Sequence, residues 1–448
     1  MFNRILIANR GEIALRIIRA CKELGISTVC VFSEADRGSH YLELADEAVC
    51  IGPGPAKDSY LDMARLLTVA EIADVDAIHP GYGFLAENAH FAEVCAEHRI
   101  KFIGPSPEAI HLMGNKARAK ALANSADVPC VPGSDGLVES EEQAIEVASR
   151  IGFPVIIKAS SGGGGRGMRV AHNQGSLING FHQARTEAEA AFKDGSVYIE
   201  KFIVNPRHVE IQILADEHGN VIHLGERDCS LQRRHQKIME EAPSPHINES
   251  KRAEMGEAAC RLAVSGGYAN AGTVEFIMGA DGQYYFMEMN ARIQVEHPVT
   301  EMVTGVDLIK EQIKVASGQR LALKQDDVTI TGHAIEVRVN AEDPDRDFAP
   351  SPGTITEFYA PGGLGVRWDS HAHAAYRIPP NYDSMIGKLI VHAEDRPSAI
   401  RRMLRALDEM HVAGVKTIVP LHKELLQDAR VQSGDVHTGY VAQFLSAR

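Results

Sequence analysis

The sequence lacks the features of a membrane-spanning protein and of a disulfide-bonded secreted protein. No uninterrupted apolar run reaches the ~18 residues that a membrane-spanning helix needs. The first residues, MFNRILIANR, have neither the apolar run nor the cleavage site of a secretory signal. The 7 cysteines are odd in number and form no C-x-x-C pair, which argues against a disulfide framework and against a zinc site. These absences predict reduced thiols and a cytoplasmic location.

Positive charge is also scarce. The formal net charge is −14, and lysine and arginine form no dense block. We therefore expect neither nucleic acid nor a membrane as a partner, although a local site for a small anion is compatible with this balance. The chain is instead rich in apolar material. Its 448 residues, 44% of them hydrophobic and 24% charged, predict a soluble globular protein of two or three domains.

Strand-like and helix-like segments alternate over residues 3–115. A short apolar run at residues 4–8 is followed by residues 11–24, where apolar side chains recur at helical spacing. Further strand-like runs occupy residues 28–32, 48–51, 77–79 and 102–103. This rhythm predicts a parallel, doubly wound sheet. The first turn lacks the G-x-G-x-x-G pattern, so the sequence does not favour a dinucleotide site.

A proline- and glycine-rich joint, PCVPGSDG at residues 129–136, marks the first domain boundary. Residues 160–168 then read SSGGGGRGM between two strand-like runs. This segment is not a P-loop, because no Gly-Lys-Ser/Thr follows. The backbone N–H groups of such glycines can approach phosphate oxygens closely, and Lys158 lies just upstream. We predict a phosphate-binding flap; the alternative is a mobile surface hairpin.

A second hairpin, TVEFIMGADGQYYFMEMN at residues 273–290, places two carboxylates close together. If the Asp-Gly pair at residues 281–282 forms the two-residue turn that it favours, Ala280 pairs with Gln283. Counting back along both strands, Glu275 then faces Glu288 directly. Side chains that face each other in this way lie about 5 Å apart.

Such a carboxylate pair needs a counter-charge. At an effective dielectric constant near 20, the repulsion is on the order of 3 kcal/mol, and the flanking apolar residues would keep water away. A divalent cation removes the conflict, and Asn290 offers another oxygen on the same face. Magnesium favours oxygen ligands of this kind together with nucleotide phosphates. The alternative is that one carboxylate is protonated, or that both side chains splay into solvent.

Three further polar segments allow two interpretations each. Residues 292–298, RIQVEHP, could hold a small anion on Arg292 and supply Glu296 as a general base, or the two could form a structural ion pair. Residues 227–237, RDCSLQRRHQK, are either a solvated loop or a source of nucleotide and anion ligands. Arg338 belongs to an alternating strand, HAIEVRVN, that is either a functional face or a surface face.

Long motifs at these positions resemble one enzyme family. The segments IANRGEIALRI, HPGYGFLAENA, GGGGRGMRV, RDCSLQRRHQK and RIQVEHPVTE are similar to those of biotin carboxylases, which belong to the ATP-grasp superfamily. The resemblance covers essentially the whole chain. It departs from the family at Ala291, where threonine or proline is frequent, and in the hairpin, which is one residue longer than in some members. Neither departure involves a predicted catalytic side chain.

The resemblance implies a multidomain fold of mixed α/β and α+β type. It predicts a Rossmann-like N-terminal domain at residues 1–128 and a mobile ATP-grasp lid with the glycine flap at residues 129–203. A C-terminal domain with a mixed or antiparallel sheet would follow at residues 204–448. The ATP-grasp core would extend over about residues 120–317.

The resemblance also implies the ligands. ATP would be bound by Lys116, Lys158, Gly164, Gly165, Glu200, Lys201, Phe202, Ile203, His208, Gln232, His235, Glu275, Ile277 and Glu288. Two Mg²⁺ or Mn²⁺ ions would be held by Glu275, Glu288 and Asn290. Bicarbonate would be bound by Lys237, Arg292, Gln294, Val295 and Glu296.

The implied chemistry is the ATP-dependent carboxylation of biotin, with Lys237, Arg292, Glu296 and Arg338 as catalytic residues. Glu296 would deprotonate bicarbonate, which attacks the γ-phosphate to give carboxyphosphate. Carboxyphosphate releases CO₂ beside biotin, and the freed phosphate takes the proton from the ureido nitrogen. Arg338 would stabilise the oxyanion that results, and Tyr82 would lie at the biotin entrance.

The resemblance finally implies partners. The carrier signature Ala-Met-Lys-Met is absent, so biotin would be attached to a separate carrier protein that also serves a carboxyltransferase. The favoured setting is acetyl-CoA carboxylase, which makes malonyl-CoA for fatty acid synthesis; a pyruvate or propionyl-CoA carboxylase is the alternative. Another ATP-grasp ligase and a catalytically silent nucleotide-binding module remain rival functions. Arg19, Glu23 and Arg367 match a homodimer interface of the family, or else belong to an ordinary solvated surface.

Overall fold

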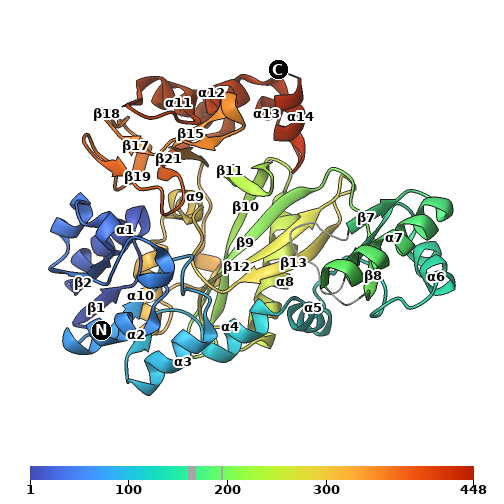
Figure 1. Ribbon diagram of the computed structural model, residues 1–448, viewed down its shortest axis with the longest axis horizontal. Helices are drawn as coiled ribbons and strands as arrows, with labels where there is room; N and C mark the ends of the chain where they lie inside the picture. The colour runs from blue at the N-terminus through green and yellow to red at the C-terminus, as the bar shows by residue number, and fades with distance from the viewer. Residues whose placement is uncertain (160–167, 193–194, 448) are drawn as a thin grey trace. The chain divides into compact units, whose positions relative to one another are not determined.

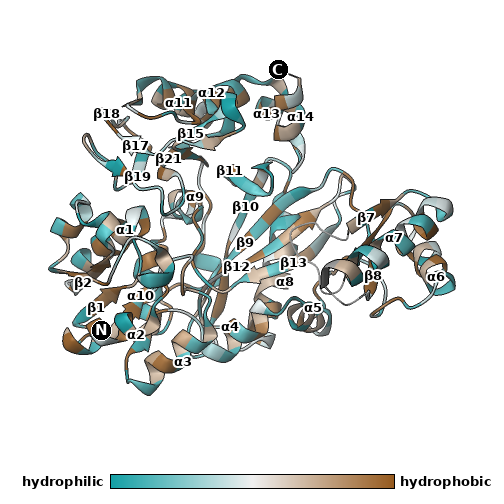
Figure 2. Cartoon of the chain, in the orientation of Figure 1, coloured by the Kyte–Doolittle hydropathy of each residue, from teal (hydrophilic) through white to brown (hydrophobic). Residues whose placement is uncertain are grey.

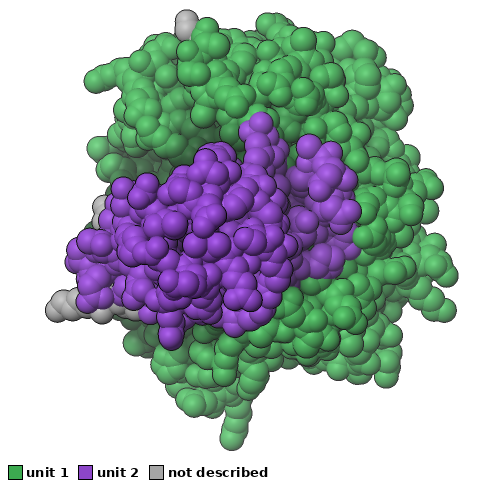
Figure 3. All heavy atoms as spheres, turned by 90° about the vertical axis from the view of Figure 1, so that its right-hand side faces the viewer, with its two compact units in different colours: residues 1–128, 207–276, 288–448 green, residues 129–206, 277–287 purple. Residues whose placement is uncertain are grey.

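The computed structural model describes residues 1–159, 168–192 and 195–447. The described chain divides into two compact units (Figure 3). Unit 1 comprises Met1–Val128, Arg207–Phe276 and Glu288–Arg448, and unit 2 comprises Pro129–Pro206 and Ile277–Met287. The three-part division by residue number stays a prediction.

The N-terminal part of unit 1 is a five-stranded parallel sheet in the order β3-β2-β1-β4-β5. Its strands are β1 (Arg4–Ile7), β2 (Ser27–Phe32), β3 (Glu47–Cys50), β4 (Ala77–His79) and β5 (Lys101–Phe102). The helices between and after them are α1 (Gly11–Glu23), α2 (Met63–Ile72), α3 (Ala89–Glu97), α4 (Pro107–Gly114) and α5 (Lys116–Ser125). The predicted parallel, doubly wound sheet is therefore confirmed.

The larger sheet has eight strands in the order β13-β12-β9-β10-β11-β14-β21-β19 (Figure 1). They are β9 (Arg207–Ala215), β10 (Val221–Arg233), β11 (Gln236–Ala242), β12 (Asn270–Met278), β13 (Tyr284–Asn290), β14 (His333–Asn340), β19 (Val366–Ser370) and β21 (Met385–Ala393). The pairs between β9 and β10, β10 and β11, β11 and β14, and β14 and β21 are antiparallel. The predicted mixed or antiparallel C-terminal sheet is confirmed.

The alternation of side chains along β14 separates a hydrophobic core from a polar face. Ile335, Val337 and Val339 belong to the core that includes Met403 of α11 (Arg396–Glu409). Ala334 instead packs with Val299 of α9 (His297–Thr304). Because side chains alternate between the faces of a strand, Glu336 and Arg338 share the α9 side with Ala334. This alternation positions the candidate site described below.

Unit 1 contains further helices and strands. They are α8 (Glu249–Ser265), α10 (Leu308–Ala316), α12 (Val419–Gln427), α13 (Ala429–Ser433), α14 (Tyr440–Ser446) and the strand pairs β15 (Glu342–Asp343) with β16 (Ala349–Pro350), β17 (Gly353–Thr354) with β20 (Arg377–Ile378), and β18 (Glu357–Tyr359) with β22 (His411–Ala413). Across the described residues, no helix has the length and apolar character needed to cross a membrane.

Unit 2 is built on a three-stranded antiparallel sheet in the order β7-β6-β8. The strands are β6 (Val155–Ala159), β7 (Met168–Ala171) and β8 (Val197–Lys201), accompanied by α6 (Glu141–Ile151) and α7 (Gln174–Phe192). Both helices carry a mixture of hydrophobic and hydrophilic residues (Figure 2), which is typical of helices that cover one face of a sheet. Their apolar side chains form a separate core with β6 and β8.

The predicted two-residue turn of the second hairpin is wrong. The N–H of Gly279 donates to the carbonyl of Gln283 at 2.8 Å, and the N–H of Gly282 donates to the carbonyl of Gly279 at 3.0 Å. The loop thus contains three residues, and Gly282 adopts the left-handed conformation (φ 76°) that this loop type requires of its last residue. The pairing beside the turn is shifted by one residue, so this turn does not place Glu275 directly opposite Glu288.

Candidate active site

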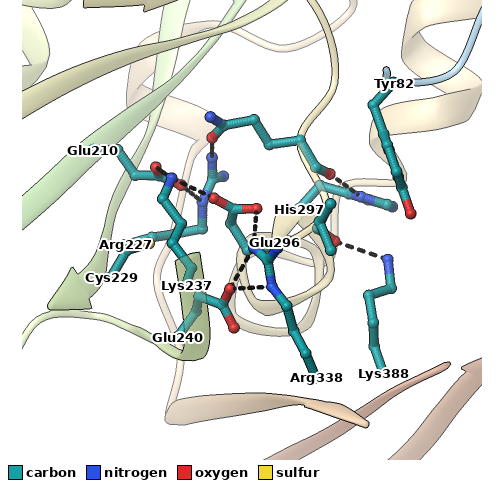
Figure 4. Close-up of polar contacts among 12 residues, drawn as sticks. Tyr82, Glu210, Arg227, Cys229, Lys237, Glu240, Glu296, His297, Arg338 and Lys388 are labelled. Atoms are coloured by element: carbon teal, nitrogen blue, oxygen red, sulfur yellow. Dashed lines mark hydrogen bonds and ion pairs between the residues drawn. The ribbon is translucent and has the colours of Figure 1, made fainter. Parts of the chain in front are cut away.

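A buried polar cluster lies on the face of the large sheet that α9 covers (Figure 4). Its side chains come from neighbouring strands and from the segment that precedes α9. The members are Glu210 of β9, Arg227 of β10, Lys237 and Glu240 of β11, Arg338 of β14, and Glu296. Glu210 and Arg227 are direct cross-strand partners. The sheet register therefore brings together charges that are up to 128 positions apart in the sequence (338 − 210).

Lys237 is surrounded by carboxylates. Its Nζ donates to Glu210 at 2.6 Å, to Glu275 at 3.0 Å and to Glu296 at 2.6 Å. Burial opposes the charge of Lys237, but Glu210 and Glu296 outweigh burial and raise its pKa well above the ordinary value. Lys237 is consequently a permanent cation, suited to holding a small anion.

Glu296 lies between two cations. Its Oε1 accepts from Lys237, and its Oε2 accepts from Nη2 of Arg338 at 3.0 Å. Burial favours the neutral acid, but Lys237 and Arg338 counteract it, and the net effect lowers the pKa of Glu296. Glu296 is thus an ionised carboxylate in the cluster, as a proton acceptor must be. The structure brings Lys237, Glu296 and Arg338 together, and their catalytic roles stay a prediction.

The segment that carries Arg292 and Glu296 is held at both ends. Arg292 donates from Nε to Glu87 at 2.8 Å and from Nη2 to the Oδ1 of Asn290 at 3.1 Å. The carbonyl of Val295 accepts from Nζ of Lys388 at 2.8 Å. These contacts fix the backbone from which the predicted anion ligands project.

Gln294 connects this segment to the sheet. Its Nε2 donates to Glu275 at 2.8 Å, and its Oε1 accepts from Arg227 at 3.0 Å. Arg227 is fully buried and also donates to Glu210, to Gln212 and to Thr300. Because the guanidinium of Arg227 donates to several side chains at once, it rigidifies the cluster.

His208 joins the cluster from β9. Its Nε2 lies 3.2 Å from Oε2 of Glu275, and the amide of Gln232 contacts its Nδ1 at 3.0 Å. Burial disfavours the charge of His208, but the neighbouring carboxylates of Glu210 and Glu275 raise its pKa to about 9. His235 lies at the exposed tip between β10 and β11, where both it and Arg234 have positive φ (66° and 49°). Arg233 pairs with Gln236, so residues 234–235 form a two-residue hairpin turn, and positive φ at both central residues is what a type I′ turn requires.

The predicted metal ligands occupy different surroundings. Asn290 donates from Nδ2 to Glu275 at 2.9 Å, whereas Glu288 pairs with Lys116 at 3.2 Å on a partly exposed surface. Among the described residues, the groups spaced to hold an ion are His208, Glu210 and Glu275, and Glu210, Cys229 and Glu296; Glu288 belongs to neither. The oxygen donors of Glu275, Glu288 and Asn290 fit magnesium chemically, and the exposed pair with Lys116 is readily displaced.

Unit 2 contributes its own predicted nucleotide ligands. Nζ of Lys158 donates to Glu200 at 2.6 Å, so these two residues are neighbours on β6 and β8. Lys201 donates to the carbonyls of Gly152 and Phe153 at 3.0 and 2.9 Å, and Phe202 donates its N–H to Pro154. Ile203 and Ile277 are half-buried. Gly164 and Gly165 lie outside the described residues.

Tyr82 is connected to the anion segment through residues that the sequence did not indicate. Its hydroxyl donates to Glu12, and Glu12 lies 3.1 Å from Nζ of Lys388, which in turn holds Val295. Sequence reasoning also missed Glu210, Arg227 and Glu240. For Glu210, the available signal was a charge at alternate positions of a strand whose other face is apolar, HVEIQI.

The predicted dimer residues lie together. Arg19, Glu23 and Arg367 line one surface hollow of unit 1 with Arg16 and Asp307. Arg367 pairs there with Glu301 and Asp369 at 2.7 Å each.

Comparison with known proteins gives matches over the whole chain. Family models match as the N-terminal domain of biotin carboxylase (residues 1–110), the ATP-binding domain of the carbamoyl-phosphate synthase L chain (115–324) and the C-terminal domain of biotin carboxylase (336–443). A biotin carboxylase of Nostoc sp. is 57% identical over 99% of each chain. A pyruvate carboxylase component of Methanothermobacter thermautotrophicus is 53% identical over 99% of this chain and 90% of the relative.

A solved structure agrees in fold. It is the biotin carboxylase domain dimer of the 2-oxoglutarate carboxylase of Hydrogenobacter thermophilus, in complex with MgADP, ADP and bicarbonate. It is 49% identical, with a TM-score of 0.89 and coverage of 99% of this chain and 98% of that chain.

Proposed function

Since the chain belongs to the biotin carboxylase family of ATP-dependent ligases, we propose that it carboxylates biotin on a separate carrier protein, using bicarbonate and ATP, by way of carboxyphosphate. The observation that carries this proposal is the buried contact of Glu296 with both Lys237 and Arg338. An anion site, a proton acceptor and a guanidinium are the groups that the two chemical steps require.

ATP and a divalent cation are the required cosubstrate and cofactor. The relative from Hydrogenobacter binds MgADP, which supports magnesium here; manganese is the alternative. Glu275, Glu288 and Asn290 would hold two such ions, and Lys116 and Lys158 would bind the phosphates beneath Gly164 and Gly165. The bound metal would neutralise phosphate oxygens during phosphoryl transfer. The nucleotide would also contact Glu200, Lys201, Phe202, Ile203, His208, Gln232, His235 and Ile277.

The residues of the anion site explain how bicarbonate becomes a nucleophile. Bicarbonate would lie against Lys237 and Arg292, with Gln294 and Val295 completing its site. Its negative charge, brought beside Glu296, raises the proton affinity of that carboxylate, which the two cations otherwise keep low. Glu296 then accepts the proton, and a bicarbonate oxygen attacks the γ-phosphorus to release ADP.

Carboxylation of biotin follows at the same site. Carboxyphosphate releases CO₂, and the freed phosphate accepts the ureido proton, so that the ureido nitrogen attacks CO₂. Arg338 stabilises the negative charge that develops on the ureido oxygen, and Tyr82 lies at the biotin entrance. Exclusion of water protects the labile intermediate.

The final acceptor would be acetyl-CoA, reached through a biotin carboxyl carrier protein and a carboxyltransferase. Relatives named simply biotin carboxylase, at 57% identity, support this setting. The relatives that belong to pyruvate and 2-oxoglutarate carboxylases make a 2-oxo acid the alternative acceptor. A homodimer through Arg19, Glu23 and Arg367 is supported by the dimeric relative. The two candidate acceptors are distinguished by purifying the complex with its carrier and measuring whether label from bicarbonate is transferred to acetyl-CoA or to pyruvate.

The test of the first half-reaction is ATP hydrolysis with magnesium and bicarbonate, with and without free biotin. Biotin should stimulate the wild-type enzyme, and Arg338→Ala should lose the biotin-dependent part by about 100-fold or more, because oxyanion donors contribute that much. Arg346→Ala, an exposed arginine of the same unit, is the matched control. Turnover indifferent to biotin would instead indicate another ATP-grasp ligase, and no turnover would indicate a silent nucleotide-binding module.

A further inference from the structure

Two glutamates face each other beside Arg338. Glu240 of β11 and Glu336 of β14 are direct cross-strand partners, and both are fully buried. Side chains of direct partners project from the same face of a sheet, close to each other. Arg338, two residues after Glu336, shares that face. Two carboxyl groups are therefore enclosed next to the guanidinium that the proposed function assigns to biotin.

The two glutamates have unequal partners. Oε1 of Glu240 accepts from Nε of Arg338 at 2.7 Å and lies 2.6 Å from its Nη2. Within the described part of the chain, neither oxygen of Glu336 accepts a hydrogen bond, and Oε2 of Glu240 also lacks a donor. Ile390, the partner of Glu336 on β21, belongs to a small apolar cluster with α9. Glu336 thus lies at the edge between the polar cluster and an apolar core.

The surrounding charges do not neutralise both carboxylates. The ionisable groups that face the pair are Lys237 on β11, Arg338 on β14, Lys388 on β21 and Glu296 before α9. Burial raises the pKa of Glu336 well above its ordinary value, and Lys388 only partly offsets this. Burial also raises the pKa of Glu240, which Arg338 draws back to about 7. An unpaired buried carboxylate is far less stable than a neutral acid.

We propose that Glu240 and Glu336 share one proton, held mainly by Glu336, and that both act as positioning residues for Arg338. A protonated Glu336 carries no negative charge and does not repel a charge on Glu240. Glu240 can therefore stay ionised. An ionised Glu240 then holds the guanidinium through Nε and Nη2 while Nη2 stays in contact with Glu296, which fixes the orientation of Arg338 for the ureido oxygen. This inference rests on the proposed function, because biotin carboxylation is what gives Arg338 its role.

The direct test is Glu240→Gln, which keeps the shape but removes the charge. The variant should lose about 10- to 100-fold in biotin-dependent kcat/KM, with a raised KM for biotin, because a hydrogen bond to an ionised partner becomes a neutral one. Bicarbonate-dependent ATP hydrolysis without biotin should fall much less. In the wild type, biotin-dependent turnover should decline below about pH 7 as Glu240 is protonated, and this decline should be absent in the variant. An unchanged KM for biotin would overturn the proposal.

Substitutions of Glu336 then locate the proton. Glutamine is neutral like the protonated acid, so Glu336→Gln should leave the acid limb of the pH profile in place. Glu336→Leu removes the hydrogen-bond donor and should move that limb to higher pH. If Glu336 is instead ionised, both variants remove a negative charge and move the limb to lower pH, which would refute the shared proton.

Two controls separate this test from other failures. Glu357→Gln removes an exposed carboxylate of β18 and should not move the limb. If the thermal midpoint shows that Glu336→Leu does not fold, Glu336→Gln alone decides. An unmoved acid limb supports the shared proton, and an acid limb moved to lower pH refutes it. Wild-type turnover that is indifferent to biotin would refute the proposed function itself, before any variant is compared.

Discussion

At the scale of single residues, the buried charge that holds the anion segment has partners within hydrogen-bond distance. Lys388, which is fully buried, contacts Glu12 at 3.1 Å and the carbonyl of Val295 at 2.8 Å. Removing one member of such a pair leaves the other charge uncompensated, which typically costs more than the pair contributes. The residues that hold the anion segment therefore also determine local stability.

Glu241 gives a prediction about pH. It is buried and accepts from Nε of Arg396 at 2.6 Å and from Nε2 of His333 at 2.7 Å. Burial favours the neutral acid, but the hydrogen bond of His333 and the charge of Arg396 prevail and lower the pKa of Glu241 to about 2. The stabilisation is thus complete above the unfolded pKa of about 4.5 and is lost as pH falls toward 2.

Glu241→Gln should consequently destabilise the protein by roughly 3 kcal/mol at pH 7, since each pKa unit corresponds to about 1.4 kcal/mol. The difference from the wild type should shrink steadily below pH 4.5. Urea unfolding at pH 7, 5 and 4 measures it. Glu357→Gln, which removes an exposed carboxylate beside His411, should show little effect at any of these pH values. A difference independent of pH would contradict the assignment.

At the scale of secondary-structure elements, helix α8 tests how local sequence stabilises unit 1. Asn248 is its N-cap, and the side chain accepts from the N–H of Lys251 at 2.9 Å. Asn248→Ala should lower the free energy of unfolding by about 1 kcal/mol, because one N–H at the helix start loses its acceptor. Asn248→Gly should lower it by only a few tenths of that amount, since glycine leaves the N–H open to water. Equal effects would show that the cap is not what stabilises the helix start.

Elements differ in how far the sequence could predict them. The strands β1 and β2 were predictable because both are continuous apolar runs separated by a helix of regular spacing. The turn at residues 280–282 was not, because Asp-Gly suits both a two-residue turn and the three-residue loop that forms here. One residue in that loop decides which side chains face each other along both strands.

The candidate site was predictable only where a long motif or a local pattern carried it. Lys237, Glu296 and Arg338 were predicted as site residues in this way, and the structure brings them together. Glu240 and Lys388 were not found, because their roles depend on the register of β11, β14 and β21, which are separated by long stretches of sequence. No local pattern specifies such a register.

At the scale of the whole molecule, each unit has its own hydrophobic core. The core of unit 2 centres on Phe181 of α7 and includes Val155 and Ile157 of β6 and Ile199 of β8. The core of the N-terminal sheet in unit 1 contains Ile5 and Ile7. We expect units with separate cores to open separately, so that Glu241→Gln and Asn248→Ala act on the unfolding of unit 1. A substitution that damages one core should therefore leave the other core protected from hydrogen exchange.

Phe181→Ala tests this independence. Phe181 is 1% exposed, and removing a buried phenylalanine typically costs about 3–5 kcal/mol. Hydrogen exchange followed by mass spectrometry should show lost protection in β6 and β8 and unchanged protection in β1 and β2. Ile72→Ala, which removes an 81% exposed apolar side chain of α2, is the matched control and should change neither. Lost protection in β1 together with β6 would mean that the two cores unfold as one, because cooperative elements open with a common free energy.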